Sequence, residues 1–220
     1  FRTRAIVKAQ LERGWEVACL TGPRQGACAA DEEVVDGIRF FRTAPPAPAP
    51  SPLAELREIA AIRRRAIAVG ATWRPDLLHA HSPVLTALAA RGAARRLDVP
   101  LVYEIRAFWE DAAVGNGTGR EGSLRYRLTR ALESHAVRRA DAVAVICEGL
   151  RRDLIRRGVA AEKIAVSPNG VDMHLFGAPP PPDPAFARSL GLEDAEVVGF
   201  IGSFYDYEGL DDLIAAMPAL

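Results

Sequence analysis

Cysteine is scarce in this sequence, and the three residues (Cys19, Cys28 and Cys147) are too scattered for a disulfide framework or a zinc site. So few cysteines are typical of a reducing compartment, and we expect a cytoplasmic protein. Net charge is also lacking, because Lys+Arg and Asp+Glu both number 28. Proteins that bind nucleic acid usually show a basic excess, so no nucleic-acid partner is expected. No apolar run reaches the length of a membrane-spanning helix, about 20 residues.

Two kinds of cofactor site are missing as well. No Gly-x-Gly-x-x-Gly links a predicted strand to a helix, so a role for nicotinamide or flavin has no support. His79 and His81 lie two residues apart and could begin a metal site, but no nearby Cys, Asp or Glu completes one with a suitable spacing. We therefore expect no cofactor and no metal ion.

The chain is rich in apolar residues and in clustered arginines. Hydrophobic residues make up 49% of the sequence, which is ordinary for a globular protein with its own core. We interpret the arginine clusters as solvated helix faces, with a phosphate- or membrane-binding surface as the alternative. The clusters are Arg63-Arg64-Arg65, Arg95-Arg96, Arg138-Arg139, Arg151-Arg152 and Arg156-Arg157.

Strand-like and helix-like segments alternate along the chain. The predicted helices span residues 3–13, 53–70, 83–97, 123–139, 148–157 and 209–220. The predicted strands span residues 15–21, 75–80, 100–105, 141–147, 163–167 and 196–201. Two further short strands flank Asp36-Gly37, a strong hairpin signal. This order predicts an α/β fold, a Rossmann-like parallel sheet with helices on both faces.

Two proline-rich stretches, at 44–52 and 179–184, interrupt this alternation. We interpret the first as a surface loop and the second as an inter-domain connection. The chain is accordingly divided into a first domain at residues 1–177, a linker at 178–194 and the start of a second Rossmann-like domain at 195–220. Both ends fall inside regular patterns, so we expect these residues to be part of a longer protein.

In open parallel sheets ligands bind where the strands end, so the residues at those points are the candidates for a site. His79 and His81 are expected to point to the same side of their strand. We interpret His79 as packed at the edge of the sheet, whereas His81, followed by Ser82 and a helix start, has the stronger functional case. Glu104 and Arg106, at the end of the next strand, form either an internal ion pair or part of a site.

Three later loops supply further candidates. Phe108 and Trp109 either line an acceptor pocket or belong to the core. Glu148 comes directly after the predicted strand 141–147. Asn169 and Gly170, after the strand 163–167, are typical of a tight turn.

Four segments carry a resemblance to a known family. Residues 140–176 (ADAVAVICEGLRRDLIRRGVAAEKIAVSPNGVDMHLF) resemble the closing segment of the first domain in family 4 retaining glycosyltransferases. Residues 4–22, the strand that reaches His79-Ala80-His81, and residues 199–214 (GFIGSFYDYEGLDDLI) are similar to the same family. Tyr103-Glu104-Ile105-Arg106, followed by Trp109-Glu110-Asp111, looks closest to enzymes of bacterial exopolysaccharide clusters associated with exosortase systems.

The resemblance implies a GT-B fold, in which one Rossmann-like domain binds the acceptor and a second binds a nucleotide-sugar. It implies retaining, metal-independent transfer of a hexosyl group to a glycan or a polyprenyl-linked sugar, in exopolysaccharide or cell-envelope glycan synthesis. The expected location is the cytoplasm, with peripheral association at the inner face of the plasma membrane as a further expectation. We assign His81 and Arg106 as catalytic. The acceptor or cleft residues are Ser82, Glu104, Phe108, Trp109, Glu148, Asn169 and Gly170, and the donor-binding residues are Gly202, Ser203 and Gly209.

The donor side departs from the family pattern, which is Gly-Arg-Leu followed closely by Lys-Gly, with the basic pair holding the diphosphate. Here the matching stretch reads Gly202-Ser203-Phe204 and Glu208-Gly209, so both basic positions are lost. Two alternatives stay open: a GT-B-fold sugar-nucleotide epimerase and a non-catalytic GT-B-like binding partner. The family's first strand and most of its donor domain lie outside this sequence, so these 220 residues alone are expected to be inactive.

Overall fold

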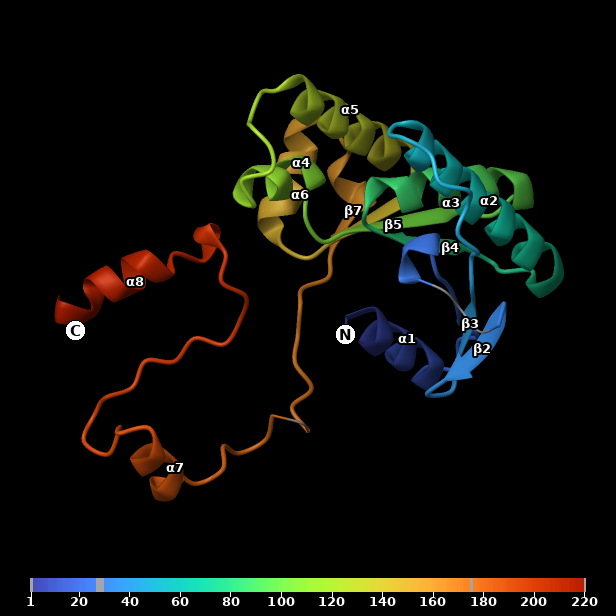
Figure 1. Cartoon of the computed structure of the whole chain (residues 1–220). Coiled ribbons are helices and arrows are strands. Elements are labelled where there is room, and N and C mark those ends of the chain that lie inside the picture. The colour runs from blue at the N-terminus through green and yellow to red at the C-terminus, as the bar shows by residue number, and fades with distance from the viewer. Residues whose placement is uncertain (1, 27–29, 175, 220) are drawn as a thin grey trace.

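Four parallel strands form the central sheet of the molecule (Figure 1). The computed structural model describes residues 2–26, 30–174 and 176–219, with the backbone alone for Asp206. Cys28 and the last residue of the predicted helix 209–220 therefore lie outside the described residues. The strands are ordered β4-β5-β6-β7, and all neighbours run parallel. They span Leu78–His81 (β4), Leu101–Ile105 (β5), Ala142–Val145 (β6) and Ile164–Val166 (β7).

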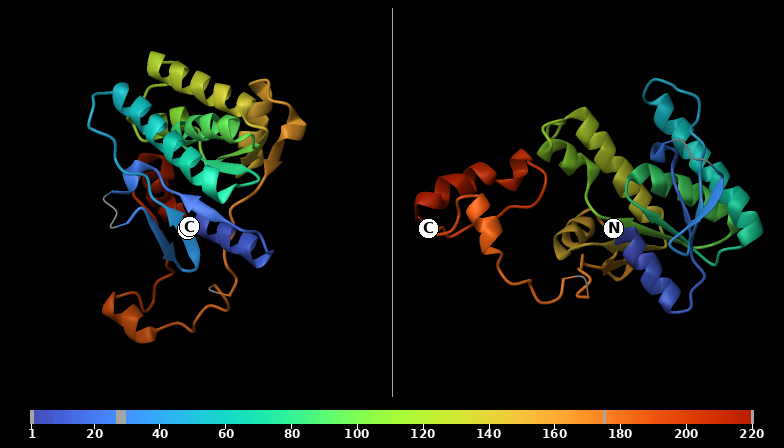
Figure 2. Two further views of the ribbon diagram at one scale, coloured as in Figure 1. Left: turned by 90° about the vertical axis from the view of Figure 1, so that its right-hand side faces the viewer. Right: turned by 60° about the horizontal axis from the view of Figure 1, so that its bottom comes forward.

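Helices connect these strands and flank the sheet. The connecting helices are α3 (Val84–Leu97), α5 (Leu124–Arg139) and α6 (Glu148–Arg156). Helix α3 packs between α5 and α2 (Leu53–Trp73), so that these three helices form one layer (Figure 2). Ser123 caps α5, because its side-chain oxygen accepts a hydrogen bond from the backbone N–H of Tyr126. The predicted α/β fold, a parallel sheet flanked by helices, is confirmed.

A second sheet of three strands contains the predicted hairpin. Its strands are β1 (Ala18–Leu20), β2 (Glu32–Val35) and β3 (Ile38–Phe41), in the order β1-β3-β2. Strand β1 runs parallel to β3, and β2 runs antiparallel to it. Asp36 and Gly37 connect β2 to β3 with positive φ angles of 52° and 76°, as a tight hairpin turn requires. A groove of about 670 Å³ separates β1 from β4, and α1 (Arg2–Glu12) and α2 complete its walls.

Apolar side chains between the central sheet and its helices form the core. Tyr103 is the largest of them, and Ile105, Val143, Val145 and Leu154 are also fully buried. Both middle strands, β5 and β6, supply side chains to this core, although the first residue of β6 is exposed. No helix among residues 2–26, 30–174 and 176–219 is both long enough and apolar enough to cross a lipid bilayer.

Two elements near the strand ends differ from the prediction. Strand β4 begins and ends later than expected, so His81 is its last residue instead of the first residue of a loop. A short helix, α4 (Trp109–Gly115), follows β5 where no helix was predicted. Seven residues are too few to show the periodicity by which a helix is recognised in a sequence.

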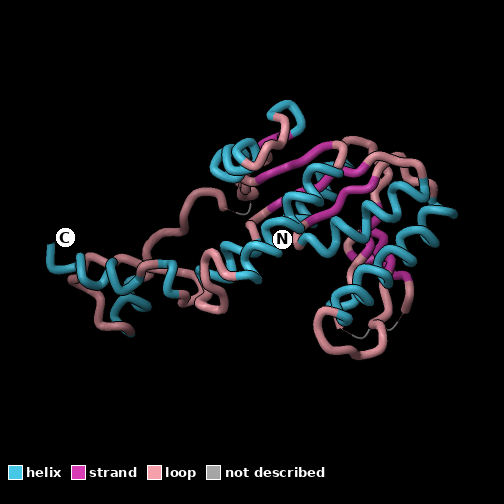
Figure 3. The backbone as a smooth tube through the Cα atoms, turned by 90° about the horizontal axis from the view of Figure 1, so that it is seen from above, coloured by secondary structure: helices cyan, strands magenta, loops and turns pink. Residues whose placement is uncertain are grey.

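The residues after β7 leave the domain along an extended path (Figure 3). They include two short helices, α7 (Pro184–Ser189) and α8 (Leu210–Ala216). The predicted strand at 196–201 does not form, and its apolar residues Val197, Val198 and Ile201 are exposed. A strand needs a neighbour to receive its backbone hydrogen bonds. Within the described part of the chain no strand pairs with this segment, which explains the difference.

Candidate functional site

Two histidines and a glutamate meet where β4 and β5 end. Alternate residues of a strand share a face, so His79 and His81 point to the same side, with ring centroids 4.4 Å apart. The register of the sheet places His81 opposite Glu104. Glu104 Oε2 lies 3.4 Å from His79 Nε2, and Glu104 Oε1 lies 3.4 Å from His81 Nδ1. Strand pairing therefore gathers three polar side chains at the carboxyl edge of the sheet.

Two arginines bind the same glutamate, one directly after β5 and one from α1. Arg106 Nε donates a hydrogen bond to Glu104 Oε1 at 3.1 Å. Arg2 Nε donates to the same oxygen at 3.0 Å, and the other Arg2 nitrogens bind the loop after β7 at residues 167–169. We call Arg2, His79, His81, Glu104 and Arg106 the carboxyl-edge cluster.

Glu104 is ionised in this cluster, and His81 is neutral near pH 7. Burial alone would raise the pKa of Glu104, but contacts with His79, His81 and Arg2 outweigh burial and hold this pKa well below its usual range. Burial lowers the pKa of His81, and the nearby Glu104 carboxylate opposes this only in part.

The hydrogen-bond network assigns the proton of neutral His81 to Nε2. Arg106 Nη2 lies 3.0 Å from His81 Nδ1, and a guanidinium can only donate, so Nδ1 accepts. The competing contact from Nδ1 to Glu104 Oε1 is longer, at 3.4 Å. The exposed fractions of the two side chains are 24% for His81 and 34% for Arg106. An imidazole N–H and a guanidinium are therefore accessible together at the carboxyl edge of the sheet.

His79, His81 and Glu104 are also close enough to hold a metal ion, since one ligand atom of each lies within 4.8 Å of the others. Sequence spacing did not reveal Glu104 as a third ligand, because only strand pairing brings it beside the histidines. Its Oε1 already accepts from two guanidinium groups, and a cation would be repelled by both. With two arginines against one glutamate, the cluster has a net positive charge and is better suited to an anionic ligand.

Besides Glu104, two of the predicted cleft residues, Ser82 and Asn169, contact the carboxyl-edge cluster. Ser82 Oγ accepts a hydrogen bond from the backbone N–H of Arg106 at 3.3 Å. Asn169 Oδ1 accepts from Arg2 Nη1 at 3.1 Å. Arg2 itself was missed, because no local pattern marks it and Glu104 is 102 residues away. A buried charge at Glu104, which must be balanced, was the one signal that a further cation was needed.

Five other candidates do not contact the cluster. Glu148 begins α6 on the same edge of the sheet and forms ion pairs within its own helix. Gly170 is exposed in the loop after β7. Gly202 and Ser203 lie in the extended segment, and Gly209, with a φ of 68°, directly precedes α8. That segment lies away from the central sheet (Figure 1).

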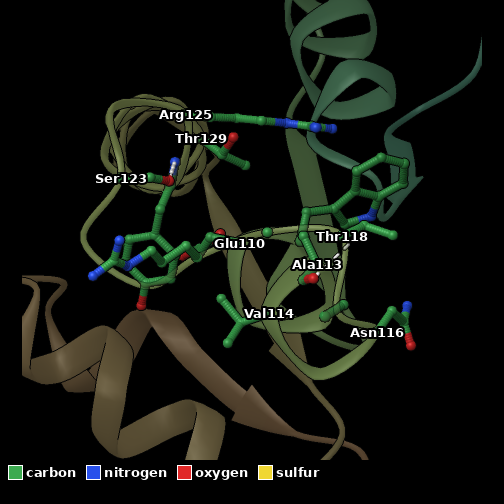
Figure 4. Close-up of a pocket in the computed structure, with 13 residues that line it drawn as sticks. Glu110, Ala113, Val114, Asn116, Thr118, Ser123, Arg125 and Thr129 are labelled. Carbon is green, nitrogen blue, oxygen red and sulfur yellow. Dashed lines mark hydrogen bonds between the residues drawn. The ribbon is translucent and has the colours of Figure 1, made fainter.

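The two aromatic candidates after β5 have different surroundings. Phe108 is buried, and the guanidinium carbon of Arg157 lies 3.9 Å from its ring centroid, so it belongs to the core. Trp109 is half exposed and lines a pocket of about 250 Å³ between α4 and α5 (Figure 4). Arg120 and Arg125 also line this pocket, whose surface is otherwise mostly apolar and which lies beside the carboxyl edge.

A second polar network, which sequence patterns did not reveal, lies against the other face of β5. Tyr103 Oη donates to Glu133 Oε1 of α5 at 2.6 Å, and Arg157 Nη1 donates to Glu110 Oε1 of α4 at 2.7 Å. Burial raises the pKa of Glu133 to about 7; the hydrogen bond from Tyr103 opposes this rise, and the charge of Glu110 adds to it. We call Tyr103, Glu110, Glu133 and Arg157 the buried acid network.

An α/β domain with a parallel sheet has its positively charged cluster at the carboxyl ends of the strands, which is the edge where open sheets of this class bind ligands. A family model described as a glycosyl transferase 4-like domain matches residues 1–170, and the chain belongs to this family. Glycogen synthase of Mycobacterium tuberculosis is 31% identical over 163 residues, which are 73% of this chain and 36% of that protein. The chain thus spans little more than a third of the length of this curated relative.

Solved structures of GT-B glycosyltransferases have the same fold. Sucrose-phosphate synthase from Thermosynechococcus elongatus superposes with a TM-score of 0.72 at 18% identity, covering 100% of this chain and 53% of that chain. Anabaena HepE, crystallised in complex with UDP, superposes with a TM-score of 0.60 at 21% identity, covering 82% of this chain and 44% of that chain.

Proposed function

We propose that the complete protein is a retaining glycosyltransferase that moves a hexosyl group from a nucleotide-sugar to a glycan or a polyprenyl-linked sugar. The observation that carries this proposal is the net positive carboxyl-edge cluster in a chain of the glycosyl transferase 4-like family. The complex of HepE with UDP favours a nucleotide-linked donor. The proposed setting is exopolysaccharide or cell-envelope glycan synthesis at the inner face of the plasma membrane.

His81 and Arg106 are the proposed catalytic residues. When the donor's glycosidic bond breaks, negative charge grows on the leaving diphosphate, and fixed positive groups lower the barrier. Arg106 uses Nε and Nη2 within the cluster, which leaves Nη1 without a hydrogen-bond partner among the described residues. His81 Nε2–H is placed to donate to a sugar hydroxyl. Glu104 positions Arg106 by accepting a hydrogen bond from its Nε, and Arg106 in turn positions His81 by donating to Nδ1.

The proposed reaction needs no metal ion, because Arg2 and Arg106 already supply positive charge beside the site. In this proposal residues 1–177 bind the acceptor, 178–194 link the domains, and 195–220 begin the donor domain. The donor meets backbone N–H groups around Gly202, Ser203 and Gly209. The positive φ of Gly209, 68°, allows the backbone to approach a ligand closely. Ser203 and Glu208 carry no positive charge, so further cations must come from the rest of the donor domain.

Incubation of the complete protein with a panel of nucleotide-sugars and soluble or lipid-linked acceptors tests this function. The expected result is acceptor-dependent release of nucleoside diphosphate, a product with the donor's anomeric configuration by NMR, and full activity in EDTA. An epimerised nucleotide-sugar formed without acceptor would instead identify an epimerase. Donor binding without any turnover would identify a binding partner, and either result overturns the proposal.

A further inference from the structure

Helix α5 has a stripe of exposed leucines on its outer face. Leu124, Leu128 and Leu132 have exposed fractions of 73%, 60% and 40%. Their spacing of four places them on one side of the helix, while Glu133 and Val137 on the other side are buried against the domain. Packing within the domain therefore does not account for this stripe. A row of exposed large apolar side chains marks a surface that binds a membrane or another protein.

Arginines border the leucine stripe. At about 100° per residue, Arg125 lies along one side of the stripe and Arg127 and Arg138 along the other, with Arg139 beyond Leu132 at the C-terminal end. All four arginines are exposed. The acidic residue of α5 is Glu133, which is buried and bound to Tyr103, so the exposed face of the helix has positive charge alone.

The acids next to α5 do not neutralise this face. Asp111 of α4 accepts a hydrogen bond from the Tyr126 hydroxyl at 2.8 Å, on the side of α5 that faces α4. Glu121, in the loop that precedes the helix, is exposed, and Glu55 of α2 is close enough to Arg125 for their charges to attract, so two acids stand against the row of arginines and the face keeps a net positive charge. The helix is thus amphipathic in a particular way, with leucines at the centre of its outer face and guanidinium groups at the margins.

We infer that this face of α5 lies on the surface of a lipid bilayer with anionic headgroups. Leucines enter the boundary between headgroups and acyl chains, while flanking arginines bind lipid phosphates, as in helices that lie in the plane of a membrane. A second copy of the chain fits this face poorly, since two rows of arginine would meet with like charge. Three leucines also offer far less area than the roughly 800 Å² per partner of a stable dimer.

This inference rests on the proposed function in one respect, the lipid-linked acceptor. The pocket between α4 and α5 lies at the Leu124 end of the helix, with Arg120 and Arg125 among its lining residues. Helix α4 follows closely after Arg106 of the carboxyl-edge cluster. A bilayer in contact with α5 would therefore lie beside the pocket through which a membrane-anchored sugar reaches the cluster.

Co-sedimentation of this chain with vesicles tests the inference. Vesicles of phosphatidylcholine with phosphatidylglycerol should bind the chain, vesicles of phosphatidylcholine alone should bind it weakly, and added salt should weaken the anionic binding. The double variant Leu124→Gln/Leu128→Gln should reduce the partition coefficient at least about tenfold. Arg125→Gln/Arg127→Gln should reduce it about 25-fold, at about fivefold for each arginine.

Matched variants far from α5 distinguish binding through this surface from non-specific binding to vesicles. Phe186→Gln/Leu190→Gln removes two apolar side chains of similar exposure, 62% and 55%, from α7 and the residue after it, and Arg152→Gln/Arg188→Gln removes two exposed arginines from α6 and α7. Both controls should bind like the unmodified chain, and circular dichroism should show all variants folded.

Three results would overturn the inference: no binding to anionic vesicles, equal binding to both kinds of vesicle, or equal losses in the control variants. A dimer that dissociates in Leu124→Gln/Leu128→Gln would instead assign the surface to a second copy. Vesicle binding is measured without donor or acceptor, so a chain that does not bind vesicles would not count against the transferase proposal. A failed transferase assay likewise leaves the vesicle result intact.

Discussion

Strand β5 has a polar network on each of its faces, and each network contains a buried glutamate. In the carboxyl-edge cluster, contacts with two imidazoles and Arg2 outweigh burial and hold the pKa of Glu104 well below its usual range. In the buried acid network, burial raises the pKa of Glu133 to about 7. Glu104 and the partner of its neighbour Tyr103, Glu133, therefore have carboxyl groups whose pKa values shift in opposite directions.

The difference comes from the partners of each carboxyl group, because both glutamates are buried. Glu104 lies beside partly exposed His81 and Arg106, so its charge is balanced where a ligand can arrive. Glu133 accepts a bond from Tyr103, while the nearby Arg157 is already bound by Glu110. We therefore propose that the first network binds a ligand and that the second attaches α4 and α5 to the sheet.

Arg157→Met should have the largest effect on stability. The substitution leaves Glu110 as a buried carboxylate without its cation, which costs about 3–5 kcal/mol. Urea denaturation of this chain at pH 7 measures the loss. Arg152→Met, at an exposed position in α6, should stay within about 0.5 kcal/mol of the unmodified chain. Equal losses in the two variants would show that the buried pair of Arg157 and Glu110 contributes no more to stability than an exposed ion pair.

Glu133→Gln should stabilise the chain at high pH. The pKa of Glu133 rises from 4.5 to about 7 on folding, so the folded state holds the proton more tightly and stability falls as pH rises from 4.5 to 7. Glutamine mimics the protonated form and removes this fall, a gain of about 3 kcal/mol above pH 7. Denaturation curves of both chains at roughly pH 5 to 8 measure this difference in the free energy of unfolding. A variant with the same pH profile as the unmodified chain would contradict the assignment.

Glu104→Gln should lower the free energy of unfolding, the opposite of Glu133→Gln, and the change should be smaller. The pKa of Glu104 falls on folding, so its contribution to stability is present above the ordinary value of 4.5 and is lost as pH falls. The variant loses charge-assisted hydrogen bonds with Arg2 and Arg106, worth about 2 kcal/mol at pH 7. The deficit should shrink in acid, and a deficit that grows in acid would rule out an ionised Glu104.

Local patterns in the sequence predicted most of the fold. Asp36-Gly37 marked the hairpin, and the apolar run around β6 marked a strand, because each depends on residues close together in the chain. The segment 196–201 has the same local pattern, but it finds no neighbouring strand among the described residues and stays unpaired. Propensity identifies a possible strand, while pairing decides whether it forms.

The candidate site was predictable only in part. His81, Glu104 and Arg106 follow from the rule that ligands bind at strand ends, and strand pairing brings them together. Arg2 and Glu133 reach their partners across 102 and 30 residues, and no periodicity encodes such contacts. The charge balance of both networks therefore required the three-dimensional structure.

One measurement tests most directly whether the carboxyl-edge cluster carries the transfer chemistry. In the complete protein, kcat/KM for hexosyl transfer is compared between Arg106→Ala and Glu133→Gln, after both variants are shown to be folded. Arg106→Ala removes a group that stabilises the departing diphosphate and should lower kcat/KM at least about 100-fold, whereas Glu133→Gln should leave it unchanged. Unchanged transfer by Arg106→Ala, or an equal loss in Glu133→Gln, would contradict the assignment of the two faces of β5.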